Sequence, residues 1–201
     1  MTSDTAPTIA ETHATLTASP SMFEMEEADV FGQPIRVWKY APASLRVIVE
    51  ASRARGDVPF IVYEDEVLTF EDHFRAVAHL ATLLVERYGV QKGDRVAIAM
   101  RNFPEWSIAF WAATAIGAIV VPLNAWWTAD ELDYGLRDSG SKVVFLDDER
   151  LARLGDVLPR IDGLATIVAR APEGTGGSGI ERWEDVLGTV GPPEAVVLRH
   201  I

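Results

Sequence analysis

The glycines of residues 174–179 (GTGGSG) have the G-x-G-x-x-G spacing with which some nucleotide-binding loops hold a pyrophosphate. That chemistry requires a tight turn directly between a strand and a helix. Here Pro172 and Glu173 separate the glycines from the preceding apolar segment, and no lysine accompanies them. A Gly/Ser-rich composition is typical of a surface loop. We therefore predict a flexible loop over residues 171–180 and no phosphate site in it.

Two other groups contain residue types that bind metal ions. His73 and His79 share a predicted helix but lie six residues apart, whereas ligands on one helical face lie three or four apart. Asp147, Asp148 and Glu149 are candidate magnesium ligands, but they end a predicted strand and begin a predicted helix, where the helix dipole favours acidic side chains. We predict structural or surface roles for all five and no metal site. No Ser-His-Asp arrangement follows from the spacing, so no catalytic residue is assigned.

The loop Asn124, Ala125, Trp126 and Trp127 is the better candidate for ligand binding. It follows the β-branched residues 119–121, which predict a strand, and open α/β sheets bind ligands at the carboxyl ends of their strands. The alternative is that the two tryptophans pack against another part of the protein, because large exposed aromatic side chains usually mark contact surfaces. Ligand contact by Asn124, Ala125 and Trp126 is the hypothesis that the structure has to test.

The elements that position these residues alternate between strands and helices. After an irregular acidic and aromatic segment at 22–40, we predict a helix within 42–56, strands at 59–63 and 67–68, a helix at 69–88, a strand in 94–100, a helix at 104–116, a buried strand ending at 121, a helix at 128–138, a strand at 142–146, a helix at 149–158, a strand at 164–169 and a short helical turn around residue 183. This alternation predicts an α/β fold: a partial doubly wound, mostly parallel sheet with helices on both faces.

Two of the helix starts carry a capping box, in which a threonine hydroxyl and an acidic side chain three residues later bind the free amides of the first turn. Thr69 with Asp72 begins one helix, and Thr128 with Glu131 begins the other. The first helix also carries one apolar stripe with alternating steps of four and three residues, which predicts the face that packs into the core. Its members are Phe70, Phe74, Val77, Ala81, Leu84 and Tyr88.

The composition narrows the possible partners and compartments. Thirty acidic and 18 basic residues give a formal charge of −12, which repels phosphate backbones and argues against a nucleic-acid partner. The absence of cysteine excludes disulfides and thiol catalysis and agrees with a cytoplasmic protein.

The polar residues 1–21 are predicted to be a disordered leader, followed by one incomplete domain at 22–201. Residues 106–129 carry no charge, but Gly117 and Pro122 interrupt them, so we predict no transmembrane span.

Four phrases resemble one enzyme family when they are taken together. They are LTFEDHFRAVAHLA (68–81), GDRVAIAMRN (93–102), WAATAIGAIVVPLN (111–124) and TADEL (128–132). Their order and spacing over about residues 42–150 resemble the N-terminal part of the adenylate-forming superfamily, and within it the acyl-CoA synthetases. The resemblance implies a ligase that uses ATP, Mg²⁺ and CoA. The acid attacks the α-phosphorus of ATP, and the CoA thiol then displaces AMP. It also gives Asn124, Ala125 and Trp126 a place near the path of CoA.

The same resemblance implies groups that these 201 residues do not contain. The family binds ATP phosphates with a Thr/Ser/Gly-rich loop ending in Pro-Lys-Gly, but the three lysines here are Lys39, Lys92 and Lys142. We therefore expect an N-terminal portion that is inactive by itself, binds none of the three cofactors alone, and has the remainder of the synthetase as its partner. The segment MFEMEE…RVWKYAP resembles that of fatty-acid ligases and suggests a fatty or other hydrophobic acid.

The rival interpretation is a non-catalytic remnant or interaction module from a truncated or split gene. Either way, a sheet that lacks part of its layers leaves strand edges and apolar faces uncovered. We therefore also expect self-association.

Overall fold

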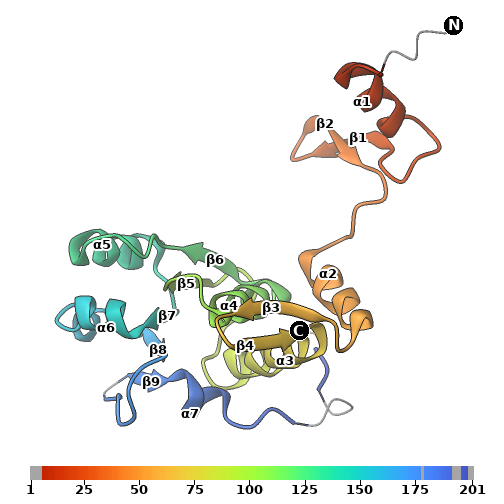
Figure 1. The fold of residues 1–201 in the computed structure, drawn as a ribbon. Helices are drawn as coiled ribbons and strands as arrows, with labels where there is room; N and C mark the ends of the chain where they lie inside the picture. The colour runs from red at the N-terminus through yellow and green to blue at the C-terminus, as the bar shows by residue number, and fades with distance from the viewer. Residues whose placement is uncertain (1–5, 178, 192–195, 199–201) are drawn as a thin grey trace, which may run out of the picture. The chain divides into compact units, whose positions relative to one another are not determined.

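The chain divides into two compact units, Met1–Ala43 and Ser44–Ile201, in a computed structural model that describes residues 6–177, 179–191 and 196–198 (Figure 1). The first unit contains a helix and a hairpin. α1 (Ile9–Thr17) begins at a capping box between Thr8 and Glu11 and has no buried residue. β1 (Met25–Val30) and β2 (Gln33–Trp38) pair antiparallel. Their turn residues, Phe31 and Gly32, both have positive φ, which suits the twist of a two-residue hairpin.

This first unit differs from the sequence-based expectation in two places. The predicted disordered leader, residues 1–21, includes α1, and the predicted irregular segment 22–40 is the β1–β2 hairpin. Residues 1–5 of the leader lie outside the described residues. Neither element buries a continuous apolar face, so the periodicity that reveals core elements gives no signal for them. The division between the two compact units falls between Ala43 and Ser44, and the expected single domain at 22–201 stays a prediction.

The second unit contains all the other elements. In chain order they are α2 (Leu45–Ser52), η1 (Arg53–Arg55), β3 (Pro59–Tyr63), β4 (Glu66–Thr69), α3 (Phe70–Glu86), β5 (Arg95–Ala99), α4 (Pro104–Ala115), β6 (Ile119–Pro122), α5 (Ala129–Ser139), β7 (Val143–Asp147), α6 (Asp148–Leu154), η2 (Leu158–Arg160), β8 (Ala165–Ala169), β9 (Ile180–Arg182) and α7 (Trp183–Leu187). β3 and β4 form a separate antiparallel hairpin.

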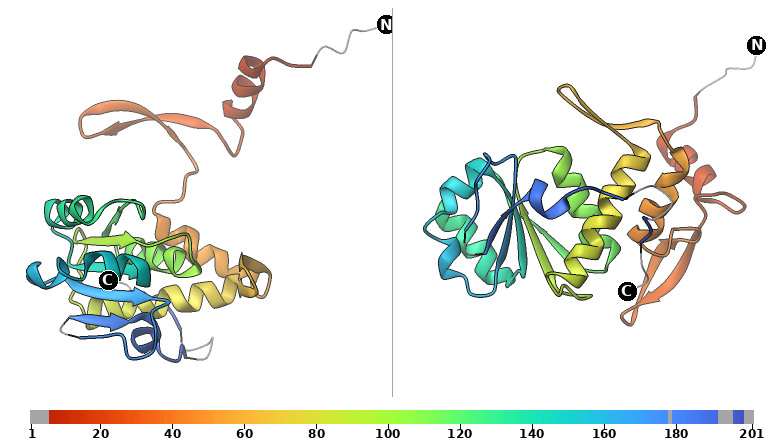
Figure 2. Two further views of the ribbon diagram at one scale, coloured as in Figure 1. Left: turned by 60° about the vertical axis from the view of Figure 1, so that its left-hand side comes forward. Right: turned by 90° about the horizontal axis from the view of Figure 1, so that it is seen from below.

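β5 to β9 form one five-stranded sheet with the order β6-β5-β7-β8-β9, and every neighbouring pair is parallel. α2, α3, α4 and α7 lie on one face, and α5 and α6 lie on the other (Figure 2). Successive residues of β7 lie on opposite faces of the sheet. Val143 and Phe145 pack into the first core, whereas Val144 and Leu146 pack into the second. The predicted α/β fold with helices on both faces of a parallel sheet is confirmed.

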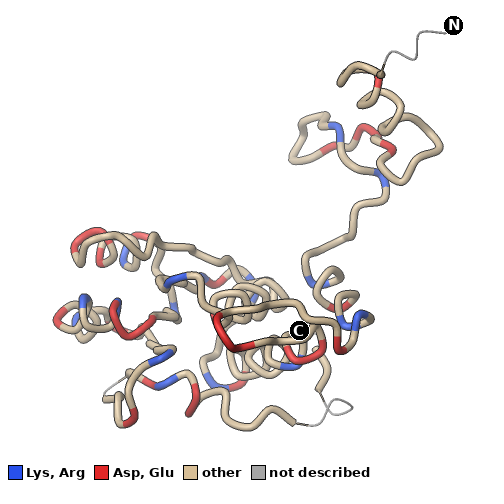
Figure 3. The backbone as a smooth tube through the Cα atoms, viewed as in Figure 1, with Lys and Arg blue, Asp and Glu red and all other residues tan. Residues whose placement is uncertain are grey.

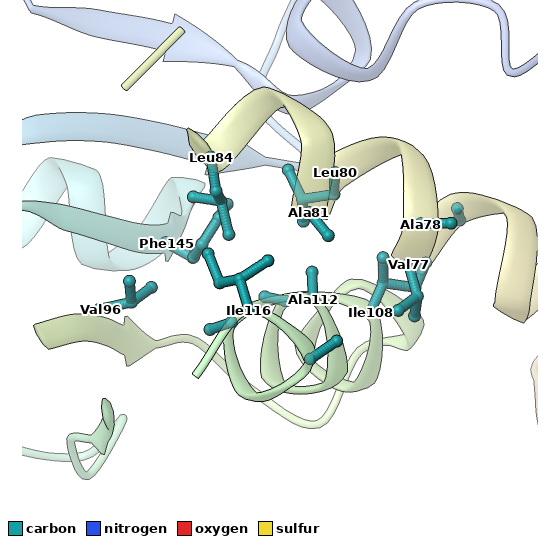
Figure 4. Close-up of a cluster of buried hydrophobic side chains, with 14 of the residues drawn as sticks. Val77, Ala78, Leu80, Ala81, Leu84, Val96, Ile108, Ala112, Ile116 and Phe145 are labelled. Atoms are coloured by element: carbon teal, nitrogen blue, oxygen red, sulfur yellow. The ribbon is translucent and has the colours of Figure 1, made fainter. Parts of the chain in front are cut away.

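The larger core lies between α3, α4 and the sheet (Figure 4). The middle of the predicted α3 stripe is buried, and its end residues Phe70 and Tyr88 are partly exposed. The Thr69–Asp72 capping box is present at the start of α3. α5 likewise begins at the predicted Thr128–Glu131 box. Figure 3 shows acidic and basic residues mixed along α5 and α6, whose apolar sides face the sheet.

β6 corrects one expectation about burial. The sequence predicts a buried strand there, but β6 lies at the edge of the sheet that the described residues form, where it pairs with β5, and Ile119 is 53% exposed. The run of β-branched residues indicates a strand, but this propensity does not distinguish an edge strand from a central one. The α4 part of the same uncharged segment does bury most of its residues. Among the described residues, no helix combines the length and apolar character needed to cross a bilayer.

The glycine-rich segment precedes a strand that the sequence does not reveal. β9 is three residues long, and its first residue, Ile180, forms an antiparallel bridge with Gly177. Residue 178 lies outside the described residues, and the flexibility of the 171–180 loop remains a prediction. The glycines end in a strand and not in a helix, so the geometry of a dinucleotide-binding turn is absent from the described part of this segment.

Candidate functional site

A cavity of about 720 Å³ opens where β5 and β6 end. The predicted loop residues Asn124, Ala125 and Trp126 all line it. The rest of its lining comes from the loop after β5, from the end of β6, from α4 and from the β3–β4 hairpin: Tyr63, Met100, Arg101, Asn102, Phe103, Trp106, Pro122 and Leu123. Clefts of this size commonly hold small molecules or cofactors.

The sheet topology explains why the cavity lies at this edge. The chain leaves β5 towards β6 on one side, but it leaves β7 towards β8 on the other side. The point between the carboxyl ends of β5 and β7 is therefore a topological switch point, where open parallel sheets bind ligands. Asp147 and Arg101 meet at that point, because the backbone N–H of Arg101 donates to Asp147 Oδ2 at 2.9 Å.

A buried ion pair fixes the predicted loop. Arg150 is fully buried, and its Nη1 lies 3.0 and 2.9 Å from the two carboxylate oxygens of Asp147. Arg150 Nε donates to the carbonyl oxygen of Ala125 at 2.7 Å, and Arg153 Nη1 donates to the same oxygen at 3.2 Å. The side chain of Asn124 accepts from the N–H of Trp126 at 2.9 Å. The backbone of the loop is therefore held by α6 and by its own asparagine.

Asp147 also fulfils the structural role predicted from the sequence. It is the N-cap of α6, where its Oδ1 accepts from the N–H of Arg150 at 3.0 Å. Asp148 and Glu149 occupy the first turn, so the preference for an acidic helix start explains this cluster. The burial of Arg150 is not predicted by the sequence. An acidic residue followed three positions later by arginine at a strand–helix junction is the only local signal for it.

Arg101 places an unpaired positive charge at the rim of the cavity. Its guanidinium carbon lies 4.9 Å from the centre of the Trp126 ring, and Trp126 is 69% exposed. Among the described residues, the Arg101 guanidinium has neither a salt bridge nor a hydrogen bond. Asp147 is already engaged by Arg150. The rim therefore offers free N–H donors beside an aromatic face, which suits a ligand that carries both an anion and a planar ring.

Comparison with known proteins identifies the family of the chain. The sequence profile described as “AMP-binding enzyme” matches residues 48–197, which include the whole sheet and the cavity. The chain belongs to this AMP-binding family. A 4-hydroxybenzoate–CoA/benzoate–CoA ligase of Rhodopseudomonas palustris is 28% identical over 170 residues, covering 74% of this chain and 31% of that protein. A long-chain-fatty-acid–CoA ligase of Bacillus subtilis is 37% identical over 106 residues, covering 52% of this chain and 19% of that protein.

Solved structures give the same fold. A coronafacic acid ligase from Pectobacterium brasiliense matches 73% of this chain and 30% of its own with a TM-score of 0.68 and 19% identity. An anthranilate CoA ligase, AuaEII, solved with anthranoyl-AMP, matches with a TM-score of 0.65 and 21% identity, covering 73% of this chain and 28% of its own. The resemblance stated from the sequence is confirmed at the level of the family and the fold. This AMP-binding family member spans less than a third of the first ligase, 31%, and less of the second, 19%.

Arg170, which stacks on two aromatic rings that line the cavity, holds the β3–β4 hairpin of this AMP-binding family member. Arg170 donates to both carboxylate oxygens of Glu66, at 2.7 and 2.8 Å, and its Nε lies 3.2 Å from Glu105. Its guanidinium also lies over the rings of Tyr63 and Phe103, at 5.0 and 4.9 Å. The Glu66 hydrogen bonds raise the pKa of Arg170, and those to Arg170 lower the pKa of Glu66. These contacts join residues far apart in sequence, so no local pattern predicts them.

The two histidines of α3 lie in different surroundings. His73 is buried and its Nε2 lies 3.0 Å from Ser107 Oγ, whereas His79 is partly exposed. Burial lowers the pKa of His73 to about 4, so its ring is neutral at pH 7. Among the described residues, no group of three or more histidine, aspartate or glutamate side chains is placed to hold a metal ion.

Proposed function

We propose that this chain is the N-terminal portion of an ATP-dependent acyl-CoA synthetase. The reaction would convert an acid, ATP and CoA into acyl-CoA, AMP and pyrophosphate through an acyl-adenylate. The observation that carries the proposal is the cavity at the carboxyl ends of β5 and β6, in a chain that belongs to the AMP-binding family. The curated relatives named above are aryl-CoA and fatty-acyl-CoA ligases.

In this proposal the Asn124–Trp126 loop contacts CoA. The rim carries an unpaired arginine beside an exposed aromatic face, which suits the phosphate groups and the adenine ring of CoA. Arg150 and Arg153 keep the loop backbone in place, so this contact surface is formed before the ligand arrives. A preformed surface binds more tightly because less ordering entropy is lost.

Among the described residues, no lysine lies free at the cavity and no group of acidic side chains is placed to hold Mg²⁺, so we derive no step of the first half-reaction from this chain. Lys39 is paired with Glu24 and Lys142 with Asp94, each at 2.7 Å. The aliphatic part of Lys92 lies beside Gly117, at the amino end of β6, which is the opposite end of that strand from the cavity. We therefore propose that the phosphate-binding loop is supplied by the remainder of the synthetase and that the 201 residues alone form no adenylate.

The acid is proposed to be fatty or otherwise hydrophobic, which agrees with the fatty-acid ligases among the relatives. We place the enzyme in the cytoplasm, in keeping with its cysteine-free, acidic sequence.

ATP–pyrophosphate exchange tests the proposal. The purified chain should show no exchange with a panel of fatty and aromatic acids, whereas the chain extended through the coding sequence that follows it should show acid-dependent exchange. Exchange by the 201 residues alone would contradict the assignment of the phosphate site to the remainder. An extended chain without exchange would favour the non-catalytic interaction module.

The loop is tested separately, because exchange requires no CoA. In the active extended enzyme, Trp126→Ala should raise KM for CoA by about tenfold, the loss of one stacked ring, and leave exchange unchanged. Tyr134→Ala removes an equally exposed ring from α5 and serves as the matched control. An unchanged KM for CoA in Trp126→Ala would reject the contact but not the synthetase.

A further inference from the structure

A second cavity, of about 610 Å³, lies away from the carboxyl ends of the strands, between α2, η1, β3, α3 and α4. Its volume is within the range of small-molecule sites, and no step of the proposed ligase reaction uses it. Its walls come from five elements of the same compact unit, so its shape is set by the packing of these elements on the larger core.

The interior of this cavity is apolar. Ile48, Phe60, Phe70 and Trp111 supply large hydrophobic surfaces. The rings of Phe60 and Phe70 are 4.5 Å apart, and the ring of Phe60 is 4.8 Å from that of His73. His73 is neutral at pH 7 and its Nε2 is within hydrogen-bonding distance of Ser107, so it adds no charge to this wall. Ile48 and Phe60 remain 41% and 40% exposed, which leaves apolar area that a ligand can cover.

One cation lines this cavity, at its exposed rim. Arg55 has its guanidinium carbon 5.3 Å from the centre of the Phe70 ring. Among the described residues, the Arg55 guanidinium has neither an ion pair nor a hydrogen bond. Arg53, two residues earlier, differs in this respect, because Glu71 accepts from both its Nε and its Nη2 at 2.8 Å. The stack on Phe70 orients the Arg55 donors without neutralising them.

We propose that this cavity binds a monocarboxylic acid with an apolar tail. The tail lies against Ile48, Phe60 and Trp111, and the carboxylate accepts hydrogen bonds from Arg55. A single cation matches a single carboxylate, whereas a phosphate or a nucleotide would place more charge and more polar surface against an apolar wall. The site does not depend on the proposed ligase reaction, and it is distinct from the cavity lined by Trp126. It would serve a catalytic or a non-catalytic chain equally.

Dodecanoate is the probe, titrated into the full 201-residue chain and followed by calorimetry and by tryptophan fluorescence. We expect saturable binding of one molecule per chain and a fluorescence change that is lost in Trp111→Phe. Arg55→Gln should weaken binding by about tenfold, the effect of removing one charge-assisted contact at an exposed rim. Arg160→Gln, which removes an exposed arginine of η2, should bind as the wild type does. Dodecanol, which lacks the charge, should bind both arginine variants equally.

A second variant tests the apolar wall of the cavity, against which the tail would lie, in case Arg55 alone contributes little to the affinity. Ile48→Asn changes a partly exposed residue, and circular dichroism melts will confirm that it folds. It should weaken both dodecanoate and dodecanol, whereas Trp126→Ala should weaken neither. The absence of binding below the micelle concentration, or equal binding by wild type, Arg55→Gln and Ile48→Asn, would overturn the proposal. A cavity covered by a second copy of the chain would appear as a dimer that dodecanoate does not dissociate, which also overturns it.

Discussion

His73 couples the stability of the main unit to pH. Burial lowers the pKa of its imidazole to about 4, below the usual value of 6.5. Between these two values the unfolded chain binds a proton that the folded chain excludes. The free energy of unfolding therefore falls as the pH decreases from about 7 to about 4, by up to about 3 kcal/mol from this residue. Urea denaturation across this range should show that His73→Gln has a smaller pH dependence than the wild type.

The matched control for this effect is on the same helix. His79 lies on α3 but is partly exposed. His79→Gln should keep the pH slope of the wild type. A slope unchanged in His73→Gln, or reduced equally in both variants, would assign the acid sensitivity to carboxylates instead.

The buried Asp147–Arg150 pair should contribute far more to the free energy of unfolding than exposed ion pairs do. Asp147→Asn removes the buried partner of Arg150 and leaves it only the exposed carboxylate of Glu149, 3.0 Å from its Nη2; breaking a buried pair costs about 3–5 kcal/mol of unfolding free energy. Asp133→Asn breaks an exposed pair with Arg137, where the cost should be about 0.5 kcal/mol or less. Urea denaturation of both variants measures the difference. Equal costs would show that Arg150 gains water or another partner when Asp147 is neutral.

At the scale of single elements, the capping boxes offer a clean comparison. Thr128 and Thr8 make the same reciprocal contacts at the starts of α5 and α1, but only α5 packs its apolar face on the sheet. Thr128→Ala should lower the unfolding free energy of the sheet-containing unit by about 1 kcal/mol. Thr8→Ala should leave that transition unchanged, because α1 buries no residue and belongs to the other compact unit. Denaturation monitored by tryptophan fluorescence compares them, and an equal effect of both variants would mean that the two units unfold together.

The elements that the sequence predicts correctly are those with a local cause. The α3 stripe and the two capping boxes need only residues three or four positions apart, and all are present. Strand neighbours and edges depend on the whole sheet, which is why β6 is predicted as buried and the short β9 is missed. For the candidate site, the loop 124–126 follows from the position of its strand. Long-range packing, which no local spacing in the sequence encodes, brings three further residues to the site: Arg101, Tyr63 and Arg170.

At the scale of the whole molecule, the net charge and the open strand edge have opposite effects on self-association. The charge of −12 keeps separate copies apart, but salt screens that repulsion beyond about 10 Å at 0.1 M. Among the described residues, β6 ends the sheet with one backbone edge unpaired, and its Ile119 is exposed. Edge strands of this kind pair readily with another chain. Self-association should therefore increase with salt as well as with protein concentration.

Sedimentation velocity tests this last expectation. The wild-type chain should shift to larger species between low salt and 0.5 M salt, and Ile119→Lys should reduce the shift, because an ammonium on the edge must be desolvated when strands pair. Tyr134→Lys adds the same charge at an exposed position on α5 and should retain most of the association. If both variants suppress it equally, the added charge matters and the edge does not. A chain that stays monomeric under all conditions would show that β6 is protected in solution, and this would weaken the case that the sheet lacks a partner.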